Sequence, residues 1–390
     1  MNTEPIISFN VPYMTGREVD FIMEANRSQR LAGDGPFTKR CHRWIEAHTG
    51  TQRALLTHSC TAALEMAAIL LDIQPGDEII MPSYTFVSTA NAFVLRGGVP
   101  VFVDVRPDTL NLDERLIEDA ITARTRAIAV VHYAGIGCDM DAIMAIARRH
   151  GLKVVEDAAQ GVMSHYKGRA LGSIGDIGAF SFHETKNVIS GEGGALLVND
   201  PQLALRAEIV REKGTDRSRF FRGEVDKYTW QEAGSSFLPG ELTAAFLWAQ
   251  LEQAQAITDE RLACWHRYHE LLAPLEASGL LRRPTVPADC GQNAHMYYVL
   301  LPEEVDRQFV LDNLKHNGVQ AVFHYVPLHS SPGGQRYGRA HGSMIHTDTL
   351  SARLVRLPLW HGLQAAQQQR VVETLFQALQ AALRNDRKYA

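Results

Sequence analysis

The stretch SFHETKNVISGEGGALLVND, residues 181–200, contains one lysine, Lys186, between an apolar run and a cluster of glycines. A lysine in a semi-buried site loses proton affinity, so its amine becomes a nucleophile that can form a Schiff base with an aldehyde. A random lysine is far more often an exposed loop residue. Here the apolar run before Lys186 and the glycines at 191–194, which allow close backbone packing, favour the reactive interpretation.

Two further polar features precede this lysine. VVEDAAQ, residues 154–160, puts Asp157 at the end of a buried strand, where an unpaired charge is costly. A protonated ring nitrogen of a cofactor would be a suitable partner, and a structural arginine explains the carboxylate about as well. THSCTAA, residues 57–63, follows a strand and opens a helix, so its free N–H groups could bind a phosphate, although an ordinary helix cap gives the same pattern.

An aromatic side chain completes this group of residues. Phe86 lies in the loop PSYTFVSTANA, residues 82–92, where it could stack on a flat cofactor ring or simply belong to the core. A phosphate site, an aromatic ring, Asp157 and then Lys186, in this order, are what pyridoxal 5'-phosphate requires. The combination predicts pyridoxal phosphate chemistry, although each feature alone is weak.

These residues need a sheet that brings them to one edge. Strands are predicted at 53–57, 78–82, 99–105, 127–135, 152–159, 177–183 and 194–198. The helix between the fourth and fifth strands should be capped by Asp139 and end at Gly151. Strands alternating with amphipathic helices indicate an α/β fold with a largely parallel sheet covered on both faces. Ligands of such sheets bind beyond the carboxyl ends of the strands.

The pattern changes beyond residue 250. A long helical pattern covers 255–276, and strand-like runs at 295–301 and 319–327 flank a helix at 309–318, with a last helix near the C-terminus. We therefore expect a large domain at 1–250 and a smaller C-terminal α/β domain at 251–390.

The bulk composition is that of a globular protein. The 390 residues carry a net charge of −5 and contain no long basic tract, so the charge does not indicate binding to nucleic acid. Five scattered cysteines fit reduced thiols, and no apolar run approaches the ~18 residues that span a bilayer. The N-terminus lacks the pattern of a signal peptide, so we expect a cytoplasmic protein with no membrane partner. The spacing of His324 and His329 does not indicate a metal site.

Over nearly its whole length the chain resembles a known family. The pair EDAAQ and K-N-x-x-x-G-E-G-G, together with LAGDGPFTKR at 31–40 and FHYVPLH at 323–329, is similar to the DegT/StrS sugar aminotransferases, which are pyridoxal phosphate enzymes of fold type I. Residues 211–230 and 234–252 are similar to the members that make dTDP-4-amino-4,6-dideoxygalactose for the enterobacterial common antigen.

The resemblance implies a role for each matching residue. Lys186 would hold the cofactor aldehyde, and Asp157 would pair with the ring nitrogen. Phe86 would stack on the ring and Gln160 would contact its hydroxyl side. The residues that would hold the phosphate are Cys60, Thr61 and Ser181.

Further residues concern the partner subunit and the substrate. The family forms homodimers with shared active sites, in which the second subunit commonly supplies an asparagine from G-Y-N-x-R. This chain reads GSSFL, so the shorter Ser236 stands at that position. The residues implied to lie near the sugar nucleotide are Gly33, Asp34 and His329.

The implied reaction transfers an amino group from L-glutamate to dTDP-4-keto-6-deoxyglucose and gives dTDP-4-amino-4,6-dideoxygalactose and 2-oxoglutarate. The sequence does not name the pathway, since common antigen, lipopolysaccharide O-antigen and an antibiotic sugar could all use this product. Alternatives are a family enzyme acting at C3 or on another nucleotide-linked keto sugar, and a non-catalytic regulator. A dehydratase of the same fold is a further alternative, but similar dehydratases carry histidine in place of Lys186.

Overall fold

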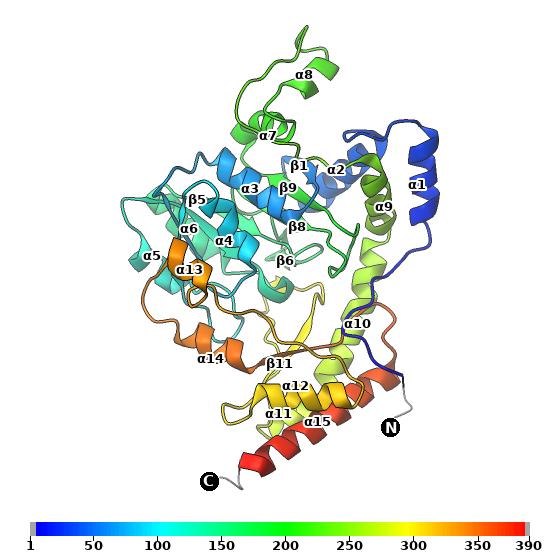
Figure 1. Ribbon diagram of the computed structural model, residues 1–390, viewed down its shortest axis with the longest axis vertical. Helices are drawn as coiled ribbons and strands as arrows, with labels where there is room; N and C mark the ends of the chain where they lie inside the picture. Colours follow the sequence, from blue (N-terminus) through cyan, green and yellow to red (C-terminus); the bar gives the residue numbers. More distant parts are fainter. Residues whose placement is uncertain (1–4, 387–390) are drawn as a thin grey trace.

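The computed structural model describes residues 5–386, and an eight-stranded sheet forms its centre (Figure 1). The strand order is β1-β9-β8-β5-β4-β2-β3-β12. The strands are β1 Arg53–Thr57, β2 Glu78–Pro82, β3 Val99–Val103, β4 Thr125–Val131, β5 Lys153–Asp157, β8 Ile177–Ser181, β9 Gly194–Val198 and β12 Arg339–Ala340. Only β9 runs antiparallel to its neighbours, so the prediction of a largely parallel sheet is confirmed.

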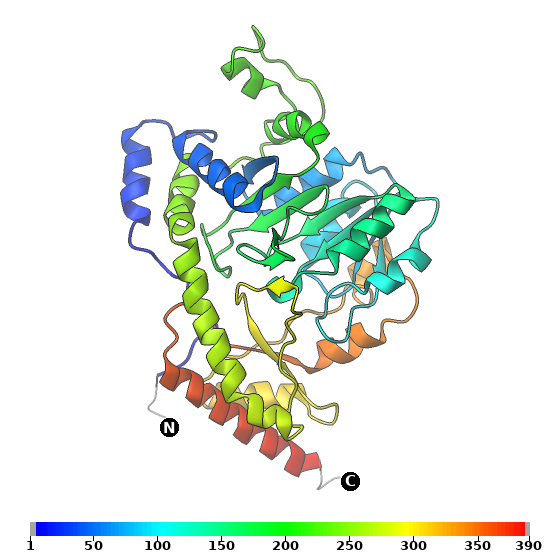
Figure 2. The same ribbon diagram turned by 180° about the vertical axis from the view of Figure 1, so that it is seen from behind.

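Helices cover both faces of this sheet, which Figure 2 shows from behind. Alternate strand residues face opposite ways: Leu55 belongs to the hydrophobic core of one face and Leu56 to that of the other. One core includes α3 Cys60–Leu70, α4 Val87–Val94 and α7 Ala204–Arg211. The other includes α1 Glu18–Arg27, α2 Pro36–Thr49, α6 Met140–His150 and α9 Glu241–Glu252. Because both faces are covered, every residue of β2, β8 and β9 is buried, and most of these residues are apolar.

Local signals set several boundaries. Asp139 caps α6 by accepting a hydrogen bond from the N–H of Ala142 at 3.2 Å, and Gly151 ends the helix with φ 63°, as predicted. The prediction of a strand over 127–135 is wrong at its end, because β4 stops at Val131 and η2 Tyr133–Gly135 follows. There Ala134 donates its N–H to a side chain, that of Gln160, instead of to a neighbouring strand.

A second layer lies below the sheet in Figure 1. Its elements are α10 Ala254–Leu271, α11 Ala273–Ala277, α12 Arg307–His316, α15 Ala365–Asp386 and the antiparallel pair β11 Tyr297–Leu300 and β13 Leu354–Leu357. These elements share a hydrophobic core of their own. The strand expected at 319–327 is not formed, since only isolated bridges join Val319 to Ile7 and Val322 to Arg356.

The chain then returns to the large sheet. The returning elements are α13 Pro332–Tyr337, β12 and α14 Ile345–Arg353, and β12 pairs with β3. The remaining short elements are α5 Ile117–Ala120, α8 Arg217–Phe221, η1 Glu114–Leu116, η3 Pro201–Leu203 and the small sheet of β10 Cys290–Gly291, β6 His165–Tyr166 and β7 Arg169–Ala170. The domain division near residue 250 stays a prediction. Within residues 5–386, no helix combines the length and the apolar character needed to span a membrane.

Candidate active site

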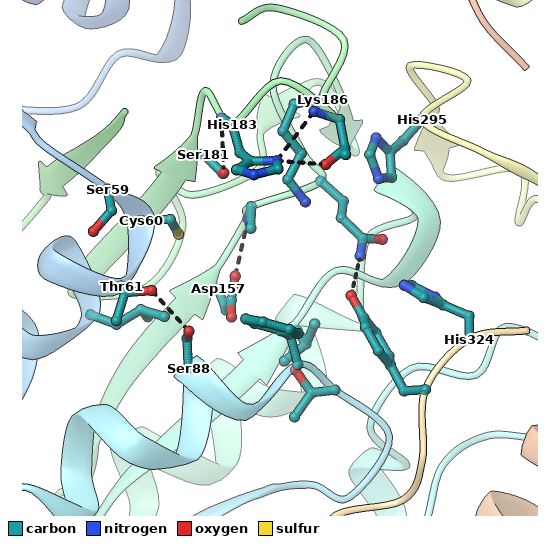
Figure 3. Close-up of a pocket in the computed structure, with 18 of the residues that line it drawn as sticks. Ser59, Cys60, Thr61, Ser88, Asp157, Ser181, His183, Lys186, His295 and His324 are labelled. Atoms are coloured by element: carbon teal, nitrogen blue, oxygen red, sulfur yellow. Dashed lines mark hydrogen bonds between the residues drawn. The ribbon is translucent and has the colours of Figure 1, made fainter. Parts of the chain in front are cut away.

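A cavity of about 450 Å³ lies beyond the carboxyl ends of β5 and β8 (Figure 3). Asp157 ends β5 and Ser181 ends β8, and the two strands pair in parallel with Asp157 opposite Ala179. The turn after β8 brings Lys186 back over this edge, so Asp157, Ser181 and Lys186 line the same cavity. The sheet therefore positions three of the predicted residues together.

The Lys186 side chain lines the cavity and is mostly enclosed. Its backbone N–H donates to His183 O at 2.9 Å, which fixes the turn, but within residues 5–386 its amine has no hydrogen-bond or ion-pair partner. Burial lowers the pKa of the Lys186 amine and the charge of Arg356 lowers it further, while Asp157 opposes the shift. A larger share of the amine is then uncharged and nucleophilic.

Asp157 is a buried carboxylate held by neutral donors. Its Oδ2 accepts from Thr89 Oγ1 at 2.7 Å and its Oδ1 accepts from the N–H of Ala159 at 3.1 Å. Thr89 Oγ1 also lies 2.8 Å from Thr85 Oγ1. No lysine or arginine among the described residues forms an ion pair with Asp157, so a structural arginine does not explain this carboxylate.

The opposite end of the cavity is the start of α3. Ser59 caps this helix by accepting from the N–H of Ala62 at 3.1 Å, which leaves the N–H groups of Cys60 and Thr61 without a partner inside the helix. Thr61 Oγ1 lies 2.8 Å from Ser88 Oγ, and Figure 3 shows these side chains gathered on one side. N–H groups, hydroxyls and the positive end of a helix together suit a phosphate.

Strand β9 reaches this helix start because it begins with glycine. A Cβ added to Gly194 would lie 2.4 Å from the backbone N of Cys60. A side chain at Gly194 would therefore push the strand away from the helix N-terminus, which explains one glycine of the GEGG stretch.

An aromatic wall lies between the two ends of the cavity. Gln160 accepts from the N–H of Ala134 at 2.7 Å and donates through Nε2 to the Tyr325 hydroxyl at 3.1 Å. The Phe86 ring is 56% exposed, and its centroid is 6.3 Å from that of Tyr325. Phe86 thus presents an apolar face to the cavity instead of joining the core.

Two histidines lie across the cavity from α3 in Figure 3. His295 Nδ1 is 3.1 Å from Asn187 Oδ1, and Asn187 Nδ2 donates to Asn293 O at 2.7 Å. The Asn187 oxygen is therefore an acceptor, and His295 Nδ1 carries the hydrogen. Burial lowers the pKa of both His295 and His324, with Lys186 and Arg356 adding to it, so both rings are neutral.

This arrangement fits pyridoxal phosphate. A phosphate would lie against the N-terminus of α3 and the hydroxyls of Thr61, Ser88 and Ser181. A ring would lie against Phe86 with its nitrogen toward Asp157, a buried anion that lacks a cation. Within residues 5–386 there is no cluster of three His, Cys, Asp or Glu residues that could hold a metal ion.

Comparison with known proteins decides the family. Residues 12–376 match the model of the DegT/DnrJ/EryC1/StrS aminotransferase family. The chain belongs to this family. It is a pyridoxal-phosphate-dependent sugar aminotransferase of fold type I, which confirms the resemblance, the fold class and the cofactor predicted above.

Relatives of this aminotransferase are similar along nearly the whole chain. GDP-perosamine synthase of Caulobacter vibrioides is 34% identical over 387 residues, with 97% of this chain and 100% of that one covered. The crystal structure of DesV of S. venezuelae, in complex with a ketimine intermediate, is 30% identical with a TM-score of 0.87, covering 96% and 99% of the two chains. The aminotransferase TlmJ of Streptoalloteichus hindustanus is 30% identical with a TM-score of 0.88, covering 96% and 99%.

Other predicted residues of the aminotransferase lie outside this cavity. Ser236 is exposed and bridges to Glu212. His329 Nδ1 is 2.7 Å from Ser83 Oγ. Gly33 and Asp34 line a second cavity of about 710 Å³. The substrate and partner-subunit roles of these four residues stay predictions.

Sequence reasoning missed several lining residues. The main ones are Ser88, His295, Tyr325 and Arg356. Arg356 had a signal, since it is a charged residue inside the apolar run LVRLPL. Ser88 lies in the same stretch as Phe86, and only its position at the start of α4 brings it to the cavity. His295 and Tyr325 come from segments far along the chain, and no local pattern indicates that they approach the site.

Proposed function

We propose that this aminotransferase transfers the amino group of L-glutamate to C4 of dTDP-4-keto-6-deoxyglucose, giving dTDP-4-amino-4,6-dideoxygalactose and 2-oxoglutarate. The observation that carries the chemistry is the cavity in which Lys186, an amine of lowered pKa without a partner, lies with Asp157, a carboxylate without a cation. The sugar is supported by the similarity of residues 211–252 to transaminases that form this product.

Lys186, Asp157 and Thr89 have different roles in the proposed reaction. Lys186 would hold the aldehyde of the bound cofactor and, once its amine is free, would take the proton from the α-carbon of the donor and move it across the intervening nitrogen. Asp157 keeps the ring nitrogen protonated, and Thr89 holds that carboxylate in place. Pyridoxal phosphate, when bound, supplies the electron sink that makes the α-proton acidic. Running these steps in reverse delivers the amino group to the sugar ketone.

Names of similar proteins support a nucleotide-linked sugar. One relative is a GDP-perosamine synthase, and the structure of DesI, 28% identical with a TM-score of 0.87, was determined with its TDP-sugar product. The GDP-perosamine synthase favours a second candidate substrate, a GDP-linked keto sugar.

We further propose that the enzyme works as a homodimer in the cytoplasm. Segment 212–236 projects from the body in Figure 1 and carries exposed aromatic side chains, with Trp230 at 81% and Phe221 at 69%. Covering them with a second subunit would bury apolar area and could bring Ser236 to the partner's phosphate site. All five cysteines are free thiols, which fits a reducing compartment.

A product assay tests this function. The protein is incubated with glutamate and either dTDP-4-keto-6-deoxyglucose or a GDP-linked 4-keto-6-deoxy sugar, and the product is identified by NMR. A 4-amino sugar of galacto configuration from the dTDP substrate supports the proposal. A gluco product, or turnover of only the GDP sugar, would change the substrate or stereochemistry, and a protein that binds no pyridoxal phosphate would contradict the chemistry.

A further inference from the structure

Arg356, on strand β13, lines the active-site cavity. Lys186 and Arg356 are the only lysine and arginine that do so among the described residues. Arg356 exchanges two backbone hydrogen bonds with Val322, at 2.7 and 3.1 Å, and the next residues of that segment include His324 and Tyr325. The guanidinium of Arg356, which comes from the second layer, therefore lines the same cavity as Lys186.

Within residues 5–386, the guanidinium of Arg356 makes no hydrogen bond and no ion pair, and its Nε is buried without a partner. Its contact is the ring of Phe9, whose centroid lies 4.8 Å from Cζ. A second buried arginine shows the contrast, since Arg261 donates to Ala294 O at 3.1 Å and to His295 O at 2.8 Å. A structural arginine in this chain is bonded, whereas Arg356 keeps its donors free toward the cavity.

The position of Arg356 indicates which anion it receives. The N-terminus of α3 and its hydroxyls form one side of the cavity, and His295 and His324 lie on the other side (Figure 3). Arg356 belongs to the histidine side, because its strand is bonded to the segment that carries His324. The cofactor phosphate, seated at α3, is therefore not its ligand.

We propose that Arg356 binds the α-carboxylate of the amino donor. This inference rests on the proposed function and adds the group that recognises the donor. The α-carboxylate is bonded directly to the carbon whose proton Lys186 removes, so its binding group must lie beside that lysine. A sugar diphosphate is separated from C4 by the whole pyranose ring. A guanidinium matches the two carboxylate oxygens with two parallel N–H donors.

The ring of Phe9 orients the guanidinium of Arg356. Stacking on the ring fixes the plane of the guanidinium without using any of its N–H groups. The backbone of Phe9 is anchored, because its N–H donates to Gln320 Oε1 at 3.3 Å. The arginine is thereby oriented before the donor arrives.

Binding of stable cofactor–donor adducts tests this assignment without turnover. The full chain, freed of cofactor, is titrated calorimetrically with N-(5'-phosphopyridoxyl)-L-glutamate and with the 4-aminobutyrate adduct, which lacks only the α-carboxylate. The unmodified protein should bind the glutamate adduct about 10- to 100-fold more tightly. In Arg356→Met this preference should fall to about onefold. Arg356→Lys keeps the charge but lacks the two parallel N–H donors, so its preference for the glutamate adduct should be intermediate.

A matched control is Arg336→Met, because Arg336 also stacks on an aromatic ring, that of Tyr337 at 5.0 Å, but on the exposed surface. This variant should keep the full preference. The cofactor-free Arg356→Met protein should melt no lower than the unmodified protein, since it loses no hydrogen bond.

The remaining outcomes contradict either this inference or the proposed function. An unchanged preference in Arg356→Met, or equal binding of both adducts by the unmodified protein, overturns the inference. The inference is also overturned if Arg356→Met loses only the preference for the glutamate adduct over the 2-aminobutyrate adduct, which lacks the γ-carboxylate. A loss of affinity for dTDP in Arg356→Met would likewise overturn it, because Arg356 would then bind the nucleotide. Failure of the unmodified protein to bind either adduct would instead contradict the pyridoxal phosphate function.

Discussion

Glu156 supports the active site from beneath the sheet. It precedes Asp157 on β5, faces the opposite way and is fully buried. Its Oε2 accepts from His132 Nε2 at 2.8 Å and from the N–H of Gly172 at 2.9 Å. Its Oε1 accepts from the N–H groups of Ile174 and Gly175, both at 2.6 Å. Burial raises the pKa of Glu156, but these hydrogen bonds outweigh it, so the pKa is lowered and the group is ionised.

We predict that Glu156→Gln destabilises the protein despite its nearly unchanged shape. The amide has one oxygen, so its NH₂ must face two buried donors whichever way it turns. His132 cannot change tautomer to help, because its Nδ1 already accepts from the N–H of Cys138 at 3.2 Å. Leaving two buried donors without an acceptor costs about 1–3 kcal/mol each, or about 4 kcal/mol in all.

The measurement is equilibrium unfolding of the cofactor-free protein in urea. Glu304→Gln is the control, since Glu304 is exposed, and should stay within about 0.5 kcal/mol of the unmodified protein. Because Glu156 holds the end of β5, its glutamine variant should also bind pyridoxal phosphate more weakly. A Glu156→Gln protein as stable as the control would show that this hydrogen-bond accounting is wrong.

Three other predictions concern the site and the sheet. Asp157→Asn should fold, because Thr89 can turn its hydroxyl toward Thr85 and accept from the new amide, but kcat should fall on the order of 100-fold; full activity would exclude Asp157 as the partner of the ring nitrogen. Phe86→Ala should leave the cofactor-free stability unchanged and weaken cofactor binding about 3- to 10-fold in a spectral titration; unchanged affinity would contradict stacking. Burial raises the pKa of Glu78, but hydrogen bonds from Arg339, Thr122 and Arg124 lower it to about 2. Its contribution to stability is therefore complete above the ordinary value of 4.5 and is lost as pH falls toward 2, so Glu78→Gln should flatten the acid limb of the stability profile; an identical limb would contradict this.

Much of the large domain could be predicted from the sequence because its signals are local. Strands 53–57 and 78–82 begin and end where predicted, since each is a largely apolar run that begins with a charged residue and lies between turns. The meeting of Asp157 and Lys186 also follows from topology, because neighbouring parallel strands end at one edge of a sheet.

Other features depend on contacts between distant segments. The run 319–327 is apolar like a strand, but its backbone meets only isolated partners, Ile7 and Arg356, from the two ends of the chain. The pairing of His295 with Asn187 joins residues 108 positions apart, so no local pattern could have indicated it. The predicted role of Ser236 depends on a second subunit, which one chain's sequence does not place.

The role of Lys186 is tested by locating the cofactor on the protein. The purified enzyme is treated with pyridoxal phosphate, reduced with sodium borohydride and digested, and the peptide carrying the phosphopyridoxyl group is identified by mass spectrometry. Lys186 should be the single modified residue, and the Lys186→Ala variant should show no stable labelling. Equal labelling of that variant, or a label on another lysine in the unmodified protein, would show that Lys186 is not the lysine that binds the cofactor aldehyde.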